Sequence, residues 1–234
     1  MNIFIIPGNP PASYYYLKWI EELKESSLFS GFHFHIYPEF KNEKNSVRYL
    51  EKMISFYEGK LANLENVVLL GHSVGGKIAY EIMKKNPSNV KKCYLLFPFL
   101  CRPGLRGRMV LSLVPQLTDL LGFEVIFKSK NYIKYIVKEV EVLTREEVSV
   151  CLGIVSHERN TVAKTLTIER VDPVCGEKIK VFYTDGDTWC GKNSTKQFSK
   201  FLNSKKLNLS HEFVVKNSER ALLTQELIMD LETL

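Results

Sequence analysis

Residues 67–78 decide the fold, and they read VVLLGHSVGGKI. The apolar run from Val67 to Leu70 has the length and composition of a buried strand, and a segment of helical period follows Val74. Glycines on both sides of Ser73 permit a sharp strand-to-helix turn that lifts the serine hydroxyl above the sheet edge. The pattern predicts Ser73 as a nucleophile and the Val74 N–H as an oxyanion donor. The alternative is a glycine-rich turn with an ordinary capping serine.

Short β-branched or aromatic runs alternate along the chain with segments of helical spacing. The runs expected to form strands are 2–6, 32–36, 67–70, 93–97, 179–183 and 205–208. Between them, apolar residues recur at helical intervals, as at Val47, Leu50, Ile54, Tyr57, Leu61 and Leu64. This alternation predicts an α/β protein with a mostly parallel central sheet and helices on both faces. A last helix is expected near Ser218 to Leu231.

One connection is too long for a simple crossover. Residues 98–178 number 81, whereas a crossover between parallel strands needs only a dozen or more. Helical spacing inside this segment, and a capping box formed by Thr144 and Glu147, predict an inserted helical cap over residues 98–175. Residues 1–97 and 176–234 would then form the core.

Composition excludes several classes of protein. The 234 residues are 45% hydrophobic and 25% charged, which is typical of one globular domain. No apolar run is long enough to span a bilayer, and no secretory signal is visible, so we expect neither a spanning protein nor standard secretion. Five widely spaced cysteines favour a reducing cytoplasm and disfavour a zinc site. We expect no metal and no cofactor.

The net charge of +6 is concentrated in one place. Residues 102–138 hold seven cations and two anions among many apolar side chains. No groove-reading or base-stacking motif accompanies this charge, so nucleic-acid binding is disfavoured. The segment is instead a candidate for peripheral contact with lipid surfaces, the alternative being a lid with a solvated cationic face.

A serine nucleophile needs a base, and the base needs a carboxylate to orient it. His211 is the best candidate for the base, because it follows the last expected strand. In folds with a nucleophile elbow, the catalytic residues come in the order serine, acid, histidine along the chain. The other histidines precede the serine (His33, His35), adjoin it (His72) or lie in the cap (His157). Pro98–Thr118 contains no acid, which leaves Asp185 and Asp187 after residues 179–183. Spacing alone does not separate the two.

The loop Pro7-Gly8-Asn9-Pro10-Pro11 directly follows the first expected strand. A second oxyanion donor comes from such an early loop in folds with a nucleophile elbow. Prolines have no N–H, so the donor would be Gly8 or Asn9. The alternative is a rigid turn without a catalytic part.

At these positions the chain resembles the lipid droplet-associated hydrolase family of the α/β-hydrolase superfamily. The matching pieces are Pro7 to Pro10, Tyr14 to Tyr16, Gly71 to Gly75, Leu96 to Pro98, Phe182-Tyr183, Asp187 to Cys190 and His211 to Phe213. The resemblance implies an α/β-hydrolase fold with Ser73 as nucleophile, Asp187 rather than Asp185 as acid, and His211 as base. It also implies lipid esters as the substrate class. Pro11, Gly191 and a shorter, less apolar cap depart from the family pattern.

The sequence therefore predicts a serine hydrolase that cleaves small-molecule or lipid carboxylic esters through an acyl-enzyme. It would be cytoplasmic, with peripheral contact at membranes or lipid droplets. Two alternatives remain open at this point. One is a catalytically weak lipid-surface binding protein on the same fold, and the other is a thioesterase or acyltransferase that uses the same residues.

Overall fold

The computed structural model describes residues 1–8, 13–36, 46–100, 173–185, 187 and 203–233. Within these residues, six strands form one sheet in the order β2-β1-β3-β4-β5-β6, and each neighbouring pair is parallel. The strands are β1 (Asn2–Ile6), β2 (Gly31–Phe34), β3 (Val67–His72), β4 (Val90–Leu96), β5 (Ile179–Tyr183) and β6 (Asn203–Lys206). The α/β class and the parallel sheet expected from the sequence are confirmed.

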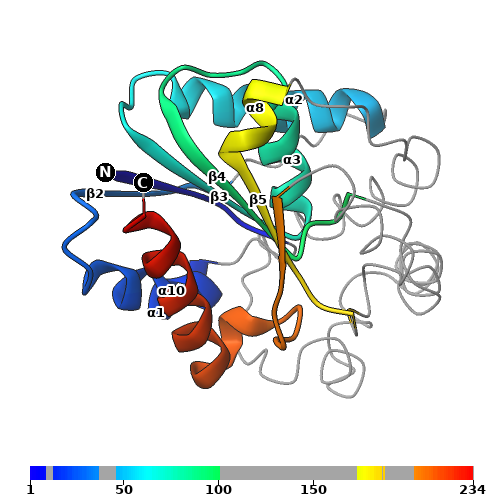
Figure 1. Ribbon diagram of the computed structural model, residues 1–234. Helices are drawn as coiled ribbons and strands as arrows, with labels where there is room; N and C mark the ends of the chain where they lie inside the picture. The colour runs from blue at the N-terminus through cyan, green and yellow to red at the C-terminus, as the bar shows by residue number, and fades with distance from the viewer. Residues whose placement is uncertain (9–12, 37–45, 101–172, 186, 188–202, 234) are drawn as a thin grey trace, which may run out of the picture.

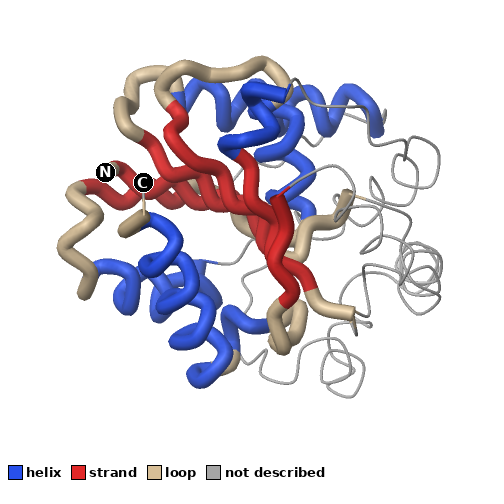
Figure 2. Tube along the Cα trace, in the orientation of Figure 1, coloured by secondary structure: helices blue, strands red, loops and turns tan. Residues whose placement is uncertain are grey.

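Helices cover both faces of the sheet (Figure 1). One face carries α1 (Ser13–Lys24), the short 3₁₀ helix η1 (Phe213–Val215) and α10 (Asn217–Leu231). The other carries α2 (Ser46–Leu61), α3 (Val74–Met83) and α8 (Pro173–Lys178). The tube view shows the strands as one twisted layer between the two groups of helices (Figure 2).

Burial follows the alternation of side chains along each strand. Val67 and Leu69 of β3 belong to the apolar cluster beneath α2 and α3, whereas Val68 and Leu70 belong to the cluster beneath α1 and α10. All six residues of β3 are buried, as a central strand covered on both faces requires. The carboxyl end of this strand, which leads into Ser73, is held on both sides by β1 and β4.

Four strands differ in their bounds from the sequence expectation. β3 runs two residues further than expected, to His72, and pairing explains the shifts of β2 and β4. β2 begins at Gly31 and ends at Phe34, because its partner β1 pairs with it only from Asn2↔Gly31 to Ile5↔Phe34. β4 begins at Val90, which pairs with Val67 despite the two lysines that follow it. The last strand, β6, is a polar edge strand that lies two residues earlier than expected.

The expected cap falls mostly on residues 101–172, which lie outside the described part of the chain. The division into a core and a cap therefore stays a prediction. Directly after this segment, α8 leads into β5 and contacts β4 and β5. Within the described residues, every helix is too short or too polar to cross a membrane.

Candidate active site

Ser73 lies at the turn between β3 and α3 in a strained backbone conformation. Its φ of 54° and ψ of −118° are rare for a residue with a Cβ, and such strain costs about 1–3 kcal/mol. The surrounding backbone holds the turn: the Ser73 N–H donates to the Leu96 carbonyl over 3.0 Å, and the Gly76 N–H donates to the Ser73 carbonyl over 3.0 Å. The sharp turn expected from the sequence is present, and it is fastened to β4.

Close packing explains the glycine two residues after the serine. A Cβ added to Gly75 would lie 2.2 Å from the Ile6 carbonyl oxygen and 2.5 Å from the Pro7 carbonyl oxygen. No real Cβ makes such contacts, so only glycine lets α3 begin against the end of β1. The glycine thereby places Ser73 beside the loop that follows β1.

Three side chains from distant parts of the chain form a hydrogen-bonded row. His211 Nε2 lies 2.9 Å from Ser73 Oγ, and His211 Nδ1 lies 2.8 Å from Asp187 Oδ2. Serine and histidine are both buried, and only 2% of the Asp187 side chain is exposed. A carboxylate accepts a hydrogen bond from Nδ1–H, so the lone pair of Nε2 can accept a hydrogen bond from the Ser73 hydroxyl. The geometry is that of a nucleophile, a base and an orienting acid.

Parallel strands bring these residues together. Asp187 follows β5 and His211 follows β6, so both lie at the carboxyl edge of the sheet where β3 delivers Ser73. Asp185 takes a different position: its side chain is 61% exposed and forms a salt bridge with Lys206 on β6. The structure therefore separates the two aspartates that spacing could not, and it brings Asp187, not Asp185, to His211.

A carboxylate that the sequence analysis did not single out anchors the loop carrying His211. Glu219 Oε2 accepts hydrogen bonds from the Ser210 N–H at 2.7 Å and from the Ser210 hydroxyl at 2.6 Å. Burial raises the pKa of Glu219, but these bonds and the nearby Lys216 outweigh burial and hold it below its usual value. Glu219 is thus charged, and it fastens the residue immediately before His211 to the first turn of α10.

The expected oxyanion donors are only partly within the described residues. Val74 begins α3, so its N–H is one of the first-turn donors that have no acceptor within the helix. Gly8 is described, and its N–H donates to the Tyr16 hydroxyl over 2.6 Å. Asn9 lies outside the described residues, as does His157, the alternative base.

The remaining described histidines are His33, His35 and His72, and they make contacts with groups other than Ser73 Oγ. The His33 ring stacks on Phe4 with 6.4 Å between ring centroids. Burial, together with Lys60 and His33, lowers the pKa of His35. His72 is buried, and both of its ring nitrogens have hydrogen-bond partners. In the described ranges, no group of three or more potential metal ligands occurs.

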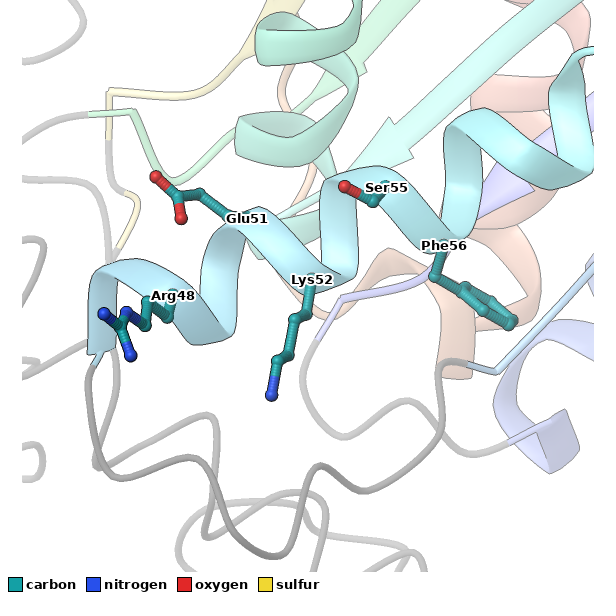
Figure 3. Close-up of a pocket in the computed structure, with 5 residues that line it drawn as sticks. All are labelled: Arg48, Glu51, Lys52, Ser55 and Phe56. Carbon is teal, nitrogen blue, oxygen red and sulfur yellow. The ribbon is translucent and has the colours of Figure 1, made fainter.

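A pocket of about 670 Å³ lies elsewhere on the surface (Figure 3). Among the described residues, its lining side chains come from α2, and they are Arg48, Glu51, Lys52, Ser55 and Phe56. None of them belongs to the row formed by Ser73, His211 and Asp187. The described lining of this pocket therefore shares no residue with the candidate active site.

Solved structures with the same fold span nearly the whole chain. The esterase EaEST from Exiguobacterium antarcticum is 16% identical with a TM-score of 0.63, covering 99% of this chain and 92% of that one. The serine hydrolase CCSP0084 from Cycloclasticus zankles is 13% identical with a TM-score of 0.65, covering 99% and 90%. The carboxylesterase CesB from Bacillus subtilis is 14% identical with a TM-score of 0.59, covering 97% and 82%. At these identities the likeness shows the fold.

The first part of the chain matches a known family, although no curated protein sequence matches the chain. The model of the family described as "Lipid-droplet associated hydrolase" matches residues 1–105, which include the loop after β1 and the turn at Ser73. The resemblance recognised in the sequence is thereby confirmed for this part of the chain. The chain has the α/β-hydrolase fold, and its first 105 residues match the lipid-droplet associated hydrolase family.

Proposed function

We propose that the chain is a serine hydrolase of carboxylic esters, with Ser73 as nucleophile, His211 as base and Asp187 as orienting acid. The observation that carries the proposal is the row of two hydrogen bonds from Asp187 through His211 to Ser73 Oγ, at 2.8 and 2.9 Å. A buried serine, histidine and carboxylate in this order have the geometry needed to activate a hydroxyl.

In the first half-reaction, Ser73 Oγ forms a bond to the acyl carbon while His211 Nε2 takes the hydroxyl proton. The Val74 N–H, at the start of α3, stabilises the negative charge that develops on the carbonyl oxygen. Because the Gly8 N–H is already bonded to Tyr16, the second donor in this proposal is the Asn9 N–H. The carbon–oxygen bond to the alcohol then breaks, and His211 gives its proton to the departing alcohol.

In the second half-reaction, a water molecule attacks the acyl carbon and His211 takes a proton from it. Collapse of this intermediate breaks the bond to Ser73 Oγ, releases the carboxylic acid and returns the proton to the serine. Asp187 keeps the imidazole in the tautomer that has its proton on Nδ1, and it stabilises the imidazolium formed in each half. No metal or cofactor takes part in the proposed chemistry.

The proposed substrate class is lipid esters, since the family that matches residues 1–105 is named for lipid droplets. We propose on the same ground that the protein works in the cytoplasm, in peripheral contact with lipid surfaces. The hydrogen-bonded row favours an enzyme over a binding protein that only retains the fold.

Hydrolysis of p-nitrophenyl esters of increasing acyl length, with a thioester alongside, tests the proposal. Asp187→Asn should lower kcat about 10⁴-fold, because an amide does not hold the imidazole in the required tautomer. Asp185→Asn is the matched control, and it should leave kcat within about twofold, since that side chain is exposed and bonded to Lys206. Equal losses in the two variants would contradict the assignment of the acid.

A further inference from the structure

Three buried hydrogen bonds form a continuous series next to Ser73. The Gly8 N–H lies 2.6 Å from Tyr16 Oη, and Tyr16 Oη lies 2.7 Å from His72 Nδ1. On the other side of the same ring, His72 Nε2 lies 3.0 Å from the backbone carbonyl oxygen of His211. All of these partners are buried, so the series is shielded from water.

The two ends of this series determine where each proton lies. A carbonyl oxygen only accepts, so His72 Nε2 carries a proton and donates a hydrogen bond to the His211 carbonyl. A backbone N–H only donates, so the Tyr16 oxygen accepts a hydrogen bond from Gly8 while the Tyr16 O–H donates one to His72 Nδ1. This pattern requires a neutral imidazole. Burial, and then the nearby His211, lower the pKa of His72 to about 3, in agreement with a neutral ring.

These hydrogen bonds join three segments of the proposed active site that are far apart in sequence. Gly8 belongs to the loop after β1, His72 is the last residue of β3, and the His211 backbone carries the base. The parts are also tightly packed: a Cβ on Gly8 would lie 2.9 Å from Ser73 Cβ, and the His72 and His211 rings have centroids 5.3 Å apart. A shift of the His72 ring would therefore displace the loop after β1, the end of β3 and the His211 backbone.

We propose that Tyr16 and His72 are positioning residues that hold the loop after β1 and the backbone of His211 in register with Ser73. The inference rests on the hydrolase function proposed above. Neither residue is required to touch the substrate, since their polar atoms are used within the chain of hydrogen bonds. Tyr16 also accepts the hydrogen bond of the Gly8 N–H, which fixes the described start of that loop.

Loss of either side chain should lower kcat far more than it raises KM. A misplacement of about 1 Å between a nucleophile and its base costs on the order of 100-fold in rate, whereas the ester-binding surface is unchanged. We expect Tyr16→Phe to lower kcat about 10- to 100-fold with KM within about threefold. His72→Leu should lose at least as much.

His72→Gln provides a rescue arm, because the glutamine amide N–H can take the place of Nε2–H and donate to the His211 carbonyl. It should retain about tenfold more activity than His72→Leu. Tyr94→Phe is the matched control: that hydroxyl is also buried, but it donates to Asp230 Oδ2 over 2.8 Å and has no link to His211. The control should lower the thermal midpoint while leaving kcat within about twofold.

Nitrogen-15 NMR of the histidine rings gives a readout that does not depend on turnover. We expect His72 to be neutral with its proton on Nε2 between pH 6 and 8. Tyr16→Phe should shift the ring signals of both His72 and His211, and Tyr94→Phe should shift neither.

The outcomes separate the two proposals. If the wild-type protein cleaves no ester, the proposed function fails, and the NMR shifts alone decide whether the hydrogen-bond chain positions His211. The inference is overturned if His72 carries its proton on Nδ1, or if Tyr16→Phe leaves the His211 signals unchanged. In an active enzyme it is also overturned if Tyr16→Phe keeps kcat within twofold, or if His72→Gln and His72→Leu lose equal activity.

Discussion

Acidification should destabilise the folded protein through His72, and the size of the effect follows from its burial. The pKa of this histidine falls from its ordinary value of 6.5 to about 3, because burial and the neighbouring His211 both disfavour the imidazolium. The unfolded chain therefore binds a proton below pH 6.5 that the folded chain does not bind until about pH 3. Stability consequently rises with pH across this window and is lost as the pH falls.

Each pH unit in this window corresponds to about 1.4 kcal/mol for a single group. Between pH 6.5 and pH 4 the contribution of His72 thus approaches about 3 kcal/mol of lost stability, a large part of the total for an ordinary domain. His72→Gln removes the titrating ring and keeps a polar side chain. The variant should start less stable near pH 7 and lose less stability on acidification.

Urea unfolding of both proteins at intervals from pH 7 to pH 4 measures this difference. Subtracting the two curves of unfolding free energy against pH cancels the groups that the proteins share. The difference should change by about 3 kcal/mol over the range, with the wild type losing more. Parallel curves would show that His72 is protonated in the folded state near its ordinary pKa, and they would refute the neutral ring on which the hydrogen-bond pattern depends.

Three further substitutions test the packing and the loop that carries the base. Gly75→Ala should destabilise the protein by several kcal/mol or prevent folding, since its Cβ would lie 2.2 Å from the Ile6 carbonyl oxygen; thermal melting measures this. Gly59→Ala, in the last turn of α2 with no described atom within 4 Å of the new Cβ, should instead stabilise by up to about 0.5–1 kcal/mol. Glu219→Gln should lower kcat about tenfold on a soluble ester, because Ser210 loses a charged acceptor beside the base; unchanged turnover would show that this contact does not position His211.

The local sequence pattern was sufficient to predict the turn at Ser73, because the strand, the glycines and the helix that produce the turn are consecutive in sequence. The choice between Asp185 and Asp187 was different. Both follow the same strand, and what separates them is the direction each side chain takes after β5, toward Lys206 or toward His211. Spacing contains no information on that direction, whereas the family resemblance favoured Asp187.

The sequence pattern alone did not predict contacts between segments that are far apart in sequence. His72 adjoins the serine in sequence, but its partners Tyr16 and His211 lie 56 and 139 residues away. Glu219 looked like an ordinary acid in the first turn of a helix. Its bond to Ser210 depends on how α10 packs after η1, which residue types and periodicity do not specify.

Locating the covalent adduct of a fluorophosphonate probe tests most directly whether Ser73 is the nucleophile. The intact protein is treated with the probe, digested and sequenced by mass spectrometry, with Ser73→Ala treated in parallel. The assignment of Ser73 as nucleophile predicts one adduct on Ser73, none in Ser73→Ala, and an unchanged thermal midpoint in that variant, because this hydroxyl lies 2.9 Å from the base. An adduct on another residue, or labelling that survives in Ser73→Ala, would contradict it.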